Sequence, residues 1–174
     1  QAQAQRHQAA VRHVYAAGAS KGQCNYTLPF EGQKVKTRIG IDDRHLTFLD
    51  MGRLAEDCGA AAICLHARTV AQAYSGHADW NAISELVQVV DIPVLGNGDI
   101  WEAADAVAMI EQTGCAGVEI GRGCLGRPWL FRDLAAAIAG EQETVLPSLG
   151  EVCAIVRRHA ELLARLWGEE HGMK

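Results

Sequence analysis

The chain has 174 residues, enough for one ordinary domain of roughly 100–200 residues. Hydrophobic residues make up 49% and charged residues 21%, a balance that excludes a disordered chain, and no apolar run is long enough for a transmembrane helix. The net charge of −5 argues against generic nucleic-acid binding, which relies on a basic surface. The six cysteines show no disulfide or zinc spacing, so we expect free thiols, no metal site and a cytoplasmic protein.

Strand-like and helix-like segments alternate from about residue 35, a pattern that predicts parallel βαβ units. We expect strands at residues 35–41, 61–66, 93–96 and 116–120, and helices at 46–58, around 83–90, at 101–113 and at 128–139. Four such units are half of a (β/α)₈ barrel. A half-barrel leaves two strand edges unpaired, so we expect self-association.

Local signals predict where several helices begin and end. Asp99 is expected to cap the helix at 101–113, and Gly114 to end it. Pro128 is expected to be the first residue of the helix that follows. Ser148 and Glu151 form a predicted capping box, which starts a helix after the barrel pattern has ended. Residues 1–34 have the weakest pattern, with a helix expected over 9–17.

Two glycine-rich turns follow the third and fourth predicted strands. Glycine lets backbone approach a ligand closely, and the helix start behind it supplies free N–H groups. Consecutive turns of this kind hold a phosphate after the last two strands of a (β/α)₈ barrel. We therefore expect a phosphate-bearing cofactor at these turns, bound by Asn97, Gly98, Asp99, Gly121, Arg122 and Gly123. A nucleophilic role for Cys124 is disfavoured, because no base lies near it in the sequence.

Polar residues near the first two predicted strands are further candidates. Lys36 and Arg38 share one side of their strand, and buried cations need an anionic partner such as a flavin or phosphate. Solvation at a strand edge is an equally open interpretation. His66 closes the next strand, either as a cofactor ligand or as a structural histidine. The loop after it carries residues suited to stacking on a nucleotide or simply exposed, namely Arg68, Gln72, Tyr74 and Trp80.

Taken together, the sequence is similar to the tRNA-dihydrouridine synthases. The motifs that carry the resemblance are residues 35–40 (Val-Lys-Thr-Arg-Ile-Gly), 65–69 (Leu-His-Ala-Arg-Thr), 72–80 (Gln-Ala-Tyr-Ser-Gly-His-Ala-Asp-Trp), 92–100 (Ile-Pro-Val-Leu-Gly-Asn-Gly-Asp-Ile) and 121–131 (Gly-Arg-Gly-Cys-Leu-Gly-Arg-Pro-Trp-Leu-Phe). Their order and spacing match from about residue 35 to 140. A generic flavin barrel would share the glycine turns but not the 72–80 loop.

The resemblance implies a TIM (β/α)₈ barrel that binds FMN, takes electrons from NADPH and reduces particular uridines of tRNA. By position, the residues that would contact FMN are Lys36, His66, Asn97, Gly98, Asp99, Gly121 and Arg122. Arg38, Arg68 and Tyr74 would contact the substrate uridine, which must leave its stack to reach the flavin. Residues 35–140 would be the C-terminal half of the barrel, strands five to eight. Residues 141–174 would begin a helical tRNA-binding domain.

The sequence also departs from the family pattern. In the family, a Cys within an N-x-G-C-P motif donates the proton to uracil C5, and this sequence contains no such motif. Cys24 is followed by Asn25-Tyr26 and does not match it. Ala67 stands where the family usually has glycine. We therefore expect a fragment that has no catalytic residue of its own and is inactive alone.

Three alternatives remain open from the sequence. The first is another FMN-dependent barrel oxidoreductase that acts on a free pyrimidine. The second is a non-catalytic half-barrel that dimerises and binds phosphate or RNA. A phosphate-sugar isomerase half-barrel is the third and least favoured.

Overall fold

The computed structural model describes residues 14–16, 32–141 and 146–172. The chain divides into two compact units, Gln1–Glu143 and Thr144–Lys174, and each is considered by itself. Among the described residues, no helix combines the length and apolar character needed to cross a membrane.

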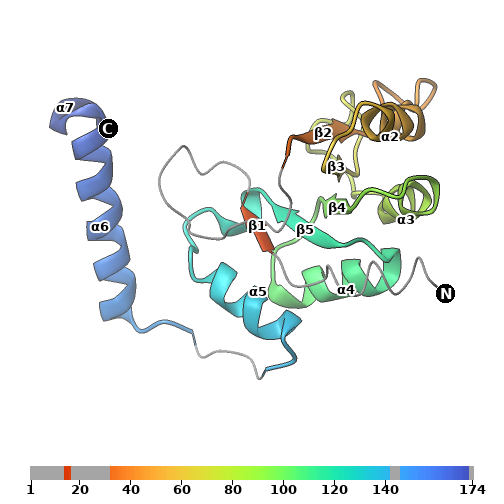
Figure 1. Ribbon diagram of the computed structural model, residues 1–174. Helices are drawn as coiled ribbons and strands as arrows, with labels where there is room; N and C mark the ends of the chain where they lie inside the picture. The colour runs from red at the N-terminus through yellow and green to blue at the C-terminus, as the bar shows by residue number, and fades with distance from the viewer. Residues whose placement is uncertain (1–13, 17–31, 142–145, 173–174) are drawn as a thin grey trace. The chain divides into compact units, whose positions relative to one another are not determined.

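The first unit is built on a five-stranded parallel sheet with the order β1-β5-β4-β3-β2 (Figure 1). Its strands are β1 (Val14–Ala16), β2 (Lys34–Arg38), β3 (Ala62–His66), β4 (Val94–Asn97) and β5 (Gly117–Ile120). From β2 to β5, each strand lies beside the next one in the chain. This order is that of a (β/α)₈ barrel, since a doubly wound sheet reverses direction at a switch point.

A helix follows each strand from β2 onward, as the alternating pattern predicts. The helical elements are α2 (Phe48–Asp57), α3 (Trp80–Val89), α4 (Ala103–Thr113), the 3₁₀ turn η1 (Arg122–Cys124) and α5 (Leu130–Ile138). Helix α2 packs on β2 and β3, α3 on β4, and α4 on β5, while neighbouring helices contact one another in chain order. The predicted α/β half-barrel architecture is therefore confirmed.

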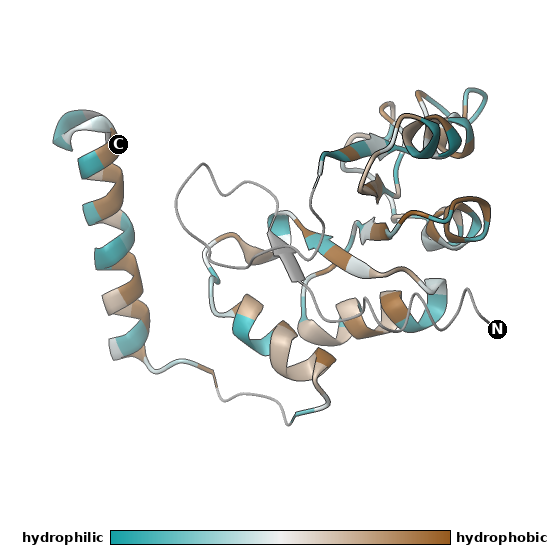
Figure 2. Cartoon of the chain, in the orientation of Figure 1, coloured by the Kyte–Doolittle hydropathy of each residue, from teal (hydrophilic) through white to brown (hydrophobic). Residues whose placement is uncertain are grey.

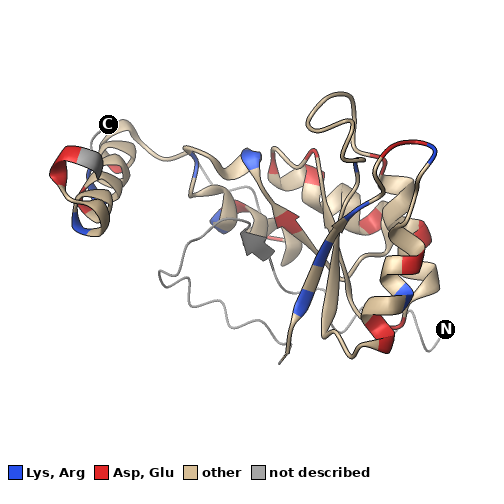
Figure 3. Cartoon of the chain, turned by 90° about the horizontal axis from the view of Figure 1, so that it is seen from above, with Lys and Arg blue, Asp and Glu red and all other residues tan. Residues whose placement is uncertain are grey.

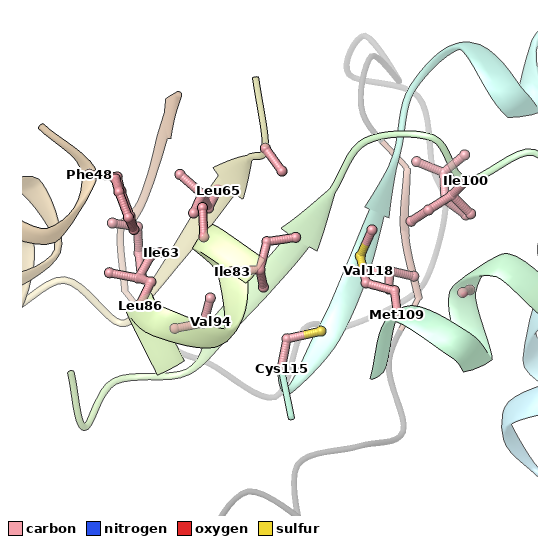
Figure 4. Packing of buried hydrophobic residues seen from close by; sticks show 14 of the residues in the cluster. Phe48, Ile63, Leu65, Ile83, Leu86, Val94, Ile100, Met109, Cys115 and Val118 are labelled. Atoms are coloured by element: carbon pink, nitrogen blue, oxygen red, sulfur yellow. The ribbon is translucent and has the colours of Figure 1, made fainter. Parts of the chain in front are cut away.

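Apolar side chains of the strands and helices form the core between the two layers (Figure 4). Ile63 and Leu65 of β3 are fully buried in it, together with Leu86 of α3. A Cβ at Gly52 of α2 would lie 2.4 Å from Leu86 Cδ1, so α2 and α3 approach closely at this glycine. Burying one such leucine stabilises the fold by about 1.5–3 kcal/mol. Strand side chains on the other face of the sheet, away from the helices, are not part of this core.

Two helix starts differ from the sequence prediction. Asp99 does not cap α4, because its carboxylate is engaged by Arg68; Glu102 is the N-cap and forms a capping box with Asp105. Helix α5 begins at Leu130, with Pro128 in the preceding turn. The predicted end of α4 is confirmed, since Gly114 is left-handed with φ 70°.

Strand β1 contradicts the helix expected over residues 9–17. Val14–Ala16 pair in parallel with Val118–Ile120 of β5. The free edge of β5 offers backbone hydrogen bonds to an extended segment, and Val and Tyr suit a strand. The other residues of the expected helix lie outside the described ranges.

The second unit contains helix α6 (Leu149–Trp167) and the short helix α7 (Glu169–Gly172). The predicted capping box is confirmed: Ser148 Oγ accepts from Glu151 N, and Ser148 N donates to Glu151 Oε2 at 2.7 Å. Figure 2 shows hydrophobic and hydrophilic residues alternating along α6, and none of its residues is buried. The cap satisfies backbone amides in the first turn of α6 and so contributes to its stability.

Replacing Ser148 with alanine is expected to cost α6 about 0.5–2 kcal/mol, because the orphan amides of the first turn lose their acceptor. Ser148→Gly is expected to cost only a few tenths of a kcal/mol. Far-ultraviolet circular dichroism during thermal unfolding measures both changes. Equal helix content and stability for wild type and Ser148→Ala would contradict the role of the cap.

Candidate functional site

A pocket of about 210 Å³ lies where the strands β2 to β5 end. It is lined by Lys36, His66, Arg68, Tyr74, Asn97, Gly98, Asp99, Ile100, Trp101, Glu119, Gly121, Arg122 and Gly123. The sequence analysis singled out all of these except Ile100, Trp101 and Glu119. Of the ten residues that the resemblance assigns to FMN or to the substrate uridine, only Arg38 is absent from the lining.

The strand register explains why these polar residues meet. Arg38 pairs with His66, His66 with Asn97, and Asn97 with Glu119. Residues in register on parallel strands share one face, so these four form a row across β2 to β5. Their face is the one opposite the helices, because the alternate residues, such as Leu65, belong to the core.

The turn after β4 holds an unusual backbone conformation. Gly98 has φ 127° and Asp99 has φ 55°, the left-handed region that a non-glycine residue seldom adopts. Trp80 Nε1 donates to Gly98 O at 3.1 Å, and Asn97 Nδ2 donates to Glu119 O at 2.6 Å. Surrounding contacts therefore hold this strained turn in place, as is typical of functional sites.

Arg68 ties the turn to the loop before α3. Its side chain is 2% exposed, and its Nη2 donates to Asp99 Oδ1 at 2.6 Å and to Gly76 O at 2.8 Å. Nε donates to Ser75 O, whereas Nη1 is buried and has no hydrogen-bond partner among the described residues. An unsatisfied buried donor is costly, so this nitrogen has the capacity to donate one more hydrogen bond.

The carboxylate of Asp99 is the counter-charge in this network. Its partial burial would raise its pKa, but hydrogen bonds from Ala78 N and from Arg68 outweigh burial, so the pKa lies below the usual value. Asp99 is therefore ionised at neutral pH. The stability that this contact contributes is fully present above the unfolded pKa near 4 and is lost as the pH falls through the folded pKa.

Arg38 supports the loop instead of facing the pocket. Its Nη1 donates to Thr69 O at 2.8 Å and to Ala73 O at 3.0 Å, and its guanidinium lies 5.9 Å from the centre of the Tyr74 ring. Backbone carbonyls thus accept two hydrogen bonds from this guanidinium. Its assignment to the substrate stays a prediction.

Lys36 has its partner on the chain. The basic residues of β2 alternate along the strand (Figure 3), and Lys36 Nζ forms an ion pair with Glu119 of β5. An anionic partner was expected for Lys36, with a flavin or phosphate as one possible source, and Glu119 supplies such a negative charge within the chain. Glu119 is a pocket residue that the sequence analysis missed; a carboxylate within an otherwise apolar strand was the available signal.

His66 is held neutral at the end of β3. Burial lowers its pKa to about 4, and the charges of Arg38, Arg68, Lys36 and Arg122 act in the same direction. A neutral imidazole donates one hydrogen bond and accepts one. His66 can thus bind a polar ligand group without adding charge to a site already rich in cations.

We predict that the His66 imidazole titrates near pH 4 in the folded protein, not near 6.5. Since the unfolded chain takes up this proton at higher pH, the contribution of His66 to stability falls as the pH drops from 6.5 toward 4. Imidazole ¹⁵N resonances followed by NMR give the pKa directly. Replacing Arg38 with methionine is expected to raise it, and a wild-type pKa near 6.5 would contradict the described environment.

Cys124 does not have the properties of a nucleophile. Its Sγ donates to Gly121 O at 3.0 Å, and burial raises the pKa of the thiol. A protonated thiol is a poor nucleophile. The cysteines of the strand region, Cys64 and Cys115, are buried, whereas Cys58 and Cys153 are exposed.

Comparison with known proteins shows the family to which the chain belongs. The family model described as "Dihydrouridine synthase (Dus)" matches residues 23–174. The chain belongs to the dihydrouridine synthase family. The parallel sheet with its outer helices is accordingly part of a dihydrouridine synthase TIM barrel.

Curated relatives carry the same name. The chain is 62% identical over 141 residues to a probable tRNA-dihydrouridine synthase of Mycobacterium leprae, covering 80% of this chain and 37% of the relative. It is 39% identical over 140 residues to one of Rhodobacter capsulatus, with 80% and 43% covered. A tRNA-dihydrouridine synthase B of Pasteurella multocida is 34% identical over 140 residues, with 80% and 42% covered. The chain thus spans about two-fifths of these dihydrouridine synthases.

Proposed function

We propose that the protein takes part in the reduction of specific tRNA uridines to 5,6-dihydrouridine, with FMN bound at the described pocket and NADPH as the electron donor. The observation that carries this proposal is the set formed by Arg68 Nη1, a buried donor without a partner among the described residues, and the cations Lys36 and Arg122 at the ends of consecutive barrel strands, in a member of the dihydrouridine synthase family. A flavin phosphate has the charge and the acceptor oxygens that such a set requires.

The described residues fit a flavin phosphate. Arg68 Nη1 is a buried donor without an acceptor, and the backbone of Gly121 faces open space, with no heavy atom within 4 Å of where a Cβ would stand. The cations Lys36 and Arg122 lie in the same lining. At about 210 Å³ the pocket is smaller than the roughly 300–1,000 Å³ of whole ligand sites. The described part of the chain therefore suits the phosphate end of FMN and not the entire molecule.

The proposal assigns tasks to five of the lining residues. Gly98 and Gly121 bring bare backbone to the phosphate, and Arg68 Nη1 donates to it. His66 remains neutral and presents a hydrogen bond to the flavin side of the site. Lys36, positioned by Glu119, places an ammonium group beside the flavin ring.

Bound FMN would supply hydride transfer, by which two electrons and one proton pass from NADPH to uracil C6 while an acid protonates C5. Residues of this chain orient the reactants and hold their charges. Tyr74 and the loop that Arg38 supports face the substrate side. The base must be extracted from the tRNA fold to reach this site.

The acid that protonates C5 is not assigned to any residue of this chain. The sequence contains no N-x-G-C-P motif, and the thiol of Cys124 is held by Gly121 O. We propose that the chain alone does not reduce uridine, since general acid catalysis contributes about 10²–10⁴-fold. The same proposal includes a cytoplasmic location, tRNA contact through residues 141–174 and self-association through unpaired strand edges.

The test uses two samples: this chain alone, and the whole protein, meaning a chain of the relatives' length that contains these residues together with an N-x-G-C-P motif. Each is incubated with FMN, NADPH and a tRNA transcript, and the digested nucleosides are analysed by mass. We expect dihydrouridine in the tRNA with the whole protein only, and no product from free uridine or uracil. Product from a free pyrimidine but not from tRNA would replace the proposal with a small-substrate flavin oxidoreductase. Tight tRNA binding without any product would favour a non-catalytic RNA-binding protein.

A further inference from the structure

Two exposed aromatic side chains flank the pocket. Tyr74 is 61% exposed and Trp101 is 45% exposed, and both contribute to the lining. Between them, the guanidinium of Arg122 lies 4.5 Å from the Tyr74 ring centre and 5.4 Å from the Trp101 ring centre. Large apolar rings held in water are costly, so a paired display beside a pocket calls for an explanation.

The backbone of Trp101 is fixed on several sides. Its N–H donates to Asp105 Oδ2 at 2.9 Å, and its carbonyl accepts from Arg127 Nη2. Gly123 packs against this turn so closely that a Cβ there would lie 3.2 Å from Trp101 Cα. Arg127 is held in turn by Glu102 at 2.7 Å. The indole is therefore displayed from a rigid support.

The backbone beside Tyr74 is fixed in a comparable way. Arg38 donates to the carbonyl of Ala73, and Ser75 N donates to Gln72 O at 2.8 Å. Ala73 adopts φ 50°, a left-handed conformation that costs a non-glycine residue energy. An arginine thus supports the backbone at each aromatic residue, which lowers the entropy lost when a ligand binds there.

Two guanidinium groups, those of Arg38 and Arg122, lie beside these rings. Among the described residues, Arg122 makes no ion pair, whereas Arg68 and Arg127 each pair with a carboxylate. Arg38 adds a second cation near the Tyr74 ring. Flat rings combined with unpaired guanidinium groups bind unstacked nucleobases by stacking and their phosphates by charge.

We propose that Trp101, together with Tyr74 and Arg122, forms a stacking site for an unpaired nucleoside of tRNA next to the target uridine. This inference rests on the proposed function and adds to it a subsite outside the flavin pocket. It also adds to the sequence prediction for Arg122: its backbone belongs to the proposed phosphate turn, and its guanidinium lies beside both rings.

The test compares Trp101→Leu and Trp101→Phe in the whole protein. Leucine removes the ring but keeps apolar volume, whereas phenylalanine keeps a flat ring. Stacking is worth about 1–3 kcal/mol per base, so we expect Trp101→Leu to weaken tRNA binding by between about 5-fold and about 150-fold. Trp101→Phe is expected to restore most of the affinity. Leu125→Ala is the matched control, because Leu125 is 73% exposed nearby but is not part of the lining.

A tRNA transcript with an abasic position beside the target uridine completes the experiment. If Trp101 stacks on that base, the loss of tRNA affinity caused by the abasic position and the loss caused by Trp101→Leu should not be additive. Trp101→Leu binding as tightly as wild type would overturn the stacking site while leaving the proposed function intact. Absence of tRNA binding by the wild-type protein would overturn both. Equal losses for Trp101→Leu and Trp101→Phe would also contradict the inference, because a ring would then not suffice.

Discussion

Replacing Asp99 with alanine is expected to lower the free energy of unfolding by about 3–5 kcal/mol, because it leaves the guanidinium of Arg68 buried and uncompensated. Arg68 is 2% exposed, and Asp99 is its carboxylate partner at 2.6 Å. Alanine would also lose the hydrogen bond from Ala78 N and would have to adopt the left-handed backbone of this turn. Urea unfolding followed by tryptophan fluorescence gives the change.

Two variants make this result specific. Asp99→Asn keeps an acceptor and a residue that tolerates the left-handed region, so it is expected to cost less than alanine. Asp50→Ala removes the partner of an exposed pair, since Asp50 is 87% exposed and 3.4 Å from Arg53, and is expected to change stability by less than about 1 kcal/mol. Equal effects of Asp99→Ala and Asp50→Ala would contradict the described network.

Gly123→Ala is expected to destabilise the fold by about 1–3 kcal/mol and to abolish flavin binding. A Cβ at Gly123 would lie 2.1 Å from Ile100 O, so backbone must move. The movement would separate η1 from the turn after β4, and these two turns form the proposed phosphate site. Thermal unfolding and FMN titration measure the two effects.

Gly52→Ala is the control for Gly123→Ala. The Cβ at Gly52 would meet Leu86 Cδ1 at 2.4 Å, the far end of a side chain that can shift. Gly52 also lies in α2, away from the pocket lining. Its replacement is expected to alter stability without altering FMN affinity. Retained FMN binding in Gly123→Ala would show that the two turns do not need their close contact.

Much of the architecture follows from local patterns that sequence reports well. Alternating periodicity places the strands β2 to β5 and the helices between them, and Gly114 and Ser148 mark helix boundaries through backbone chemistry. Val14–Ala16 could not be placed, because that strand depends on an edge of β5 more than 100 residues away in the chain.

The site was predicted at the level of position but not of contacts. His66, Asn97 and Gly98 lie at the carboxyl ends of neighbouring parallel strands, and these ends meet at one pocket. Which carboxylate pairs with which cation depends on register across several strands, so Lys36–Glu119 is invisible to local reasoning. Asp99 is a second example. Its position in the sequence indicates a helix cap, but the buried guanidinium of Arg68 donates a hydrogen bond to its carboxylate.

Trp101 was missed for a different reason, whereas Tyr74 was predicted to contact the substrate. An aromatic residue at a helix start, such as Trp101, is normally assigned to the core. Its exposure follows from contacts made by Arg127 and Gly123, which lie on the next turn of the barrel. Such display is a tertiary property, and only the three-dimensional arrangement reveals it.

Comparing the binding of FMN and riboflavin tests the central claim most directly, because the two differ only by the phosphate. The account predicts that the protein binds FMN about 10- to 100-fold more tightly than riboflavin, as charged hydrogen bonds from the turns and from Arg68 would provide. Inorganic phosphate should compete with FMN. Equal affinity for the two flavins, or a folded protein that binds neither, would contradict a phosphate site at the ends of β4 and β5.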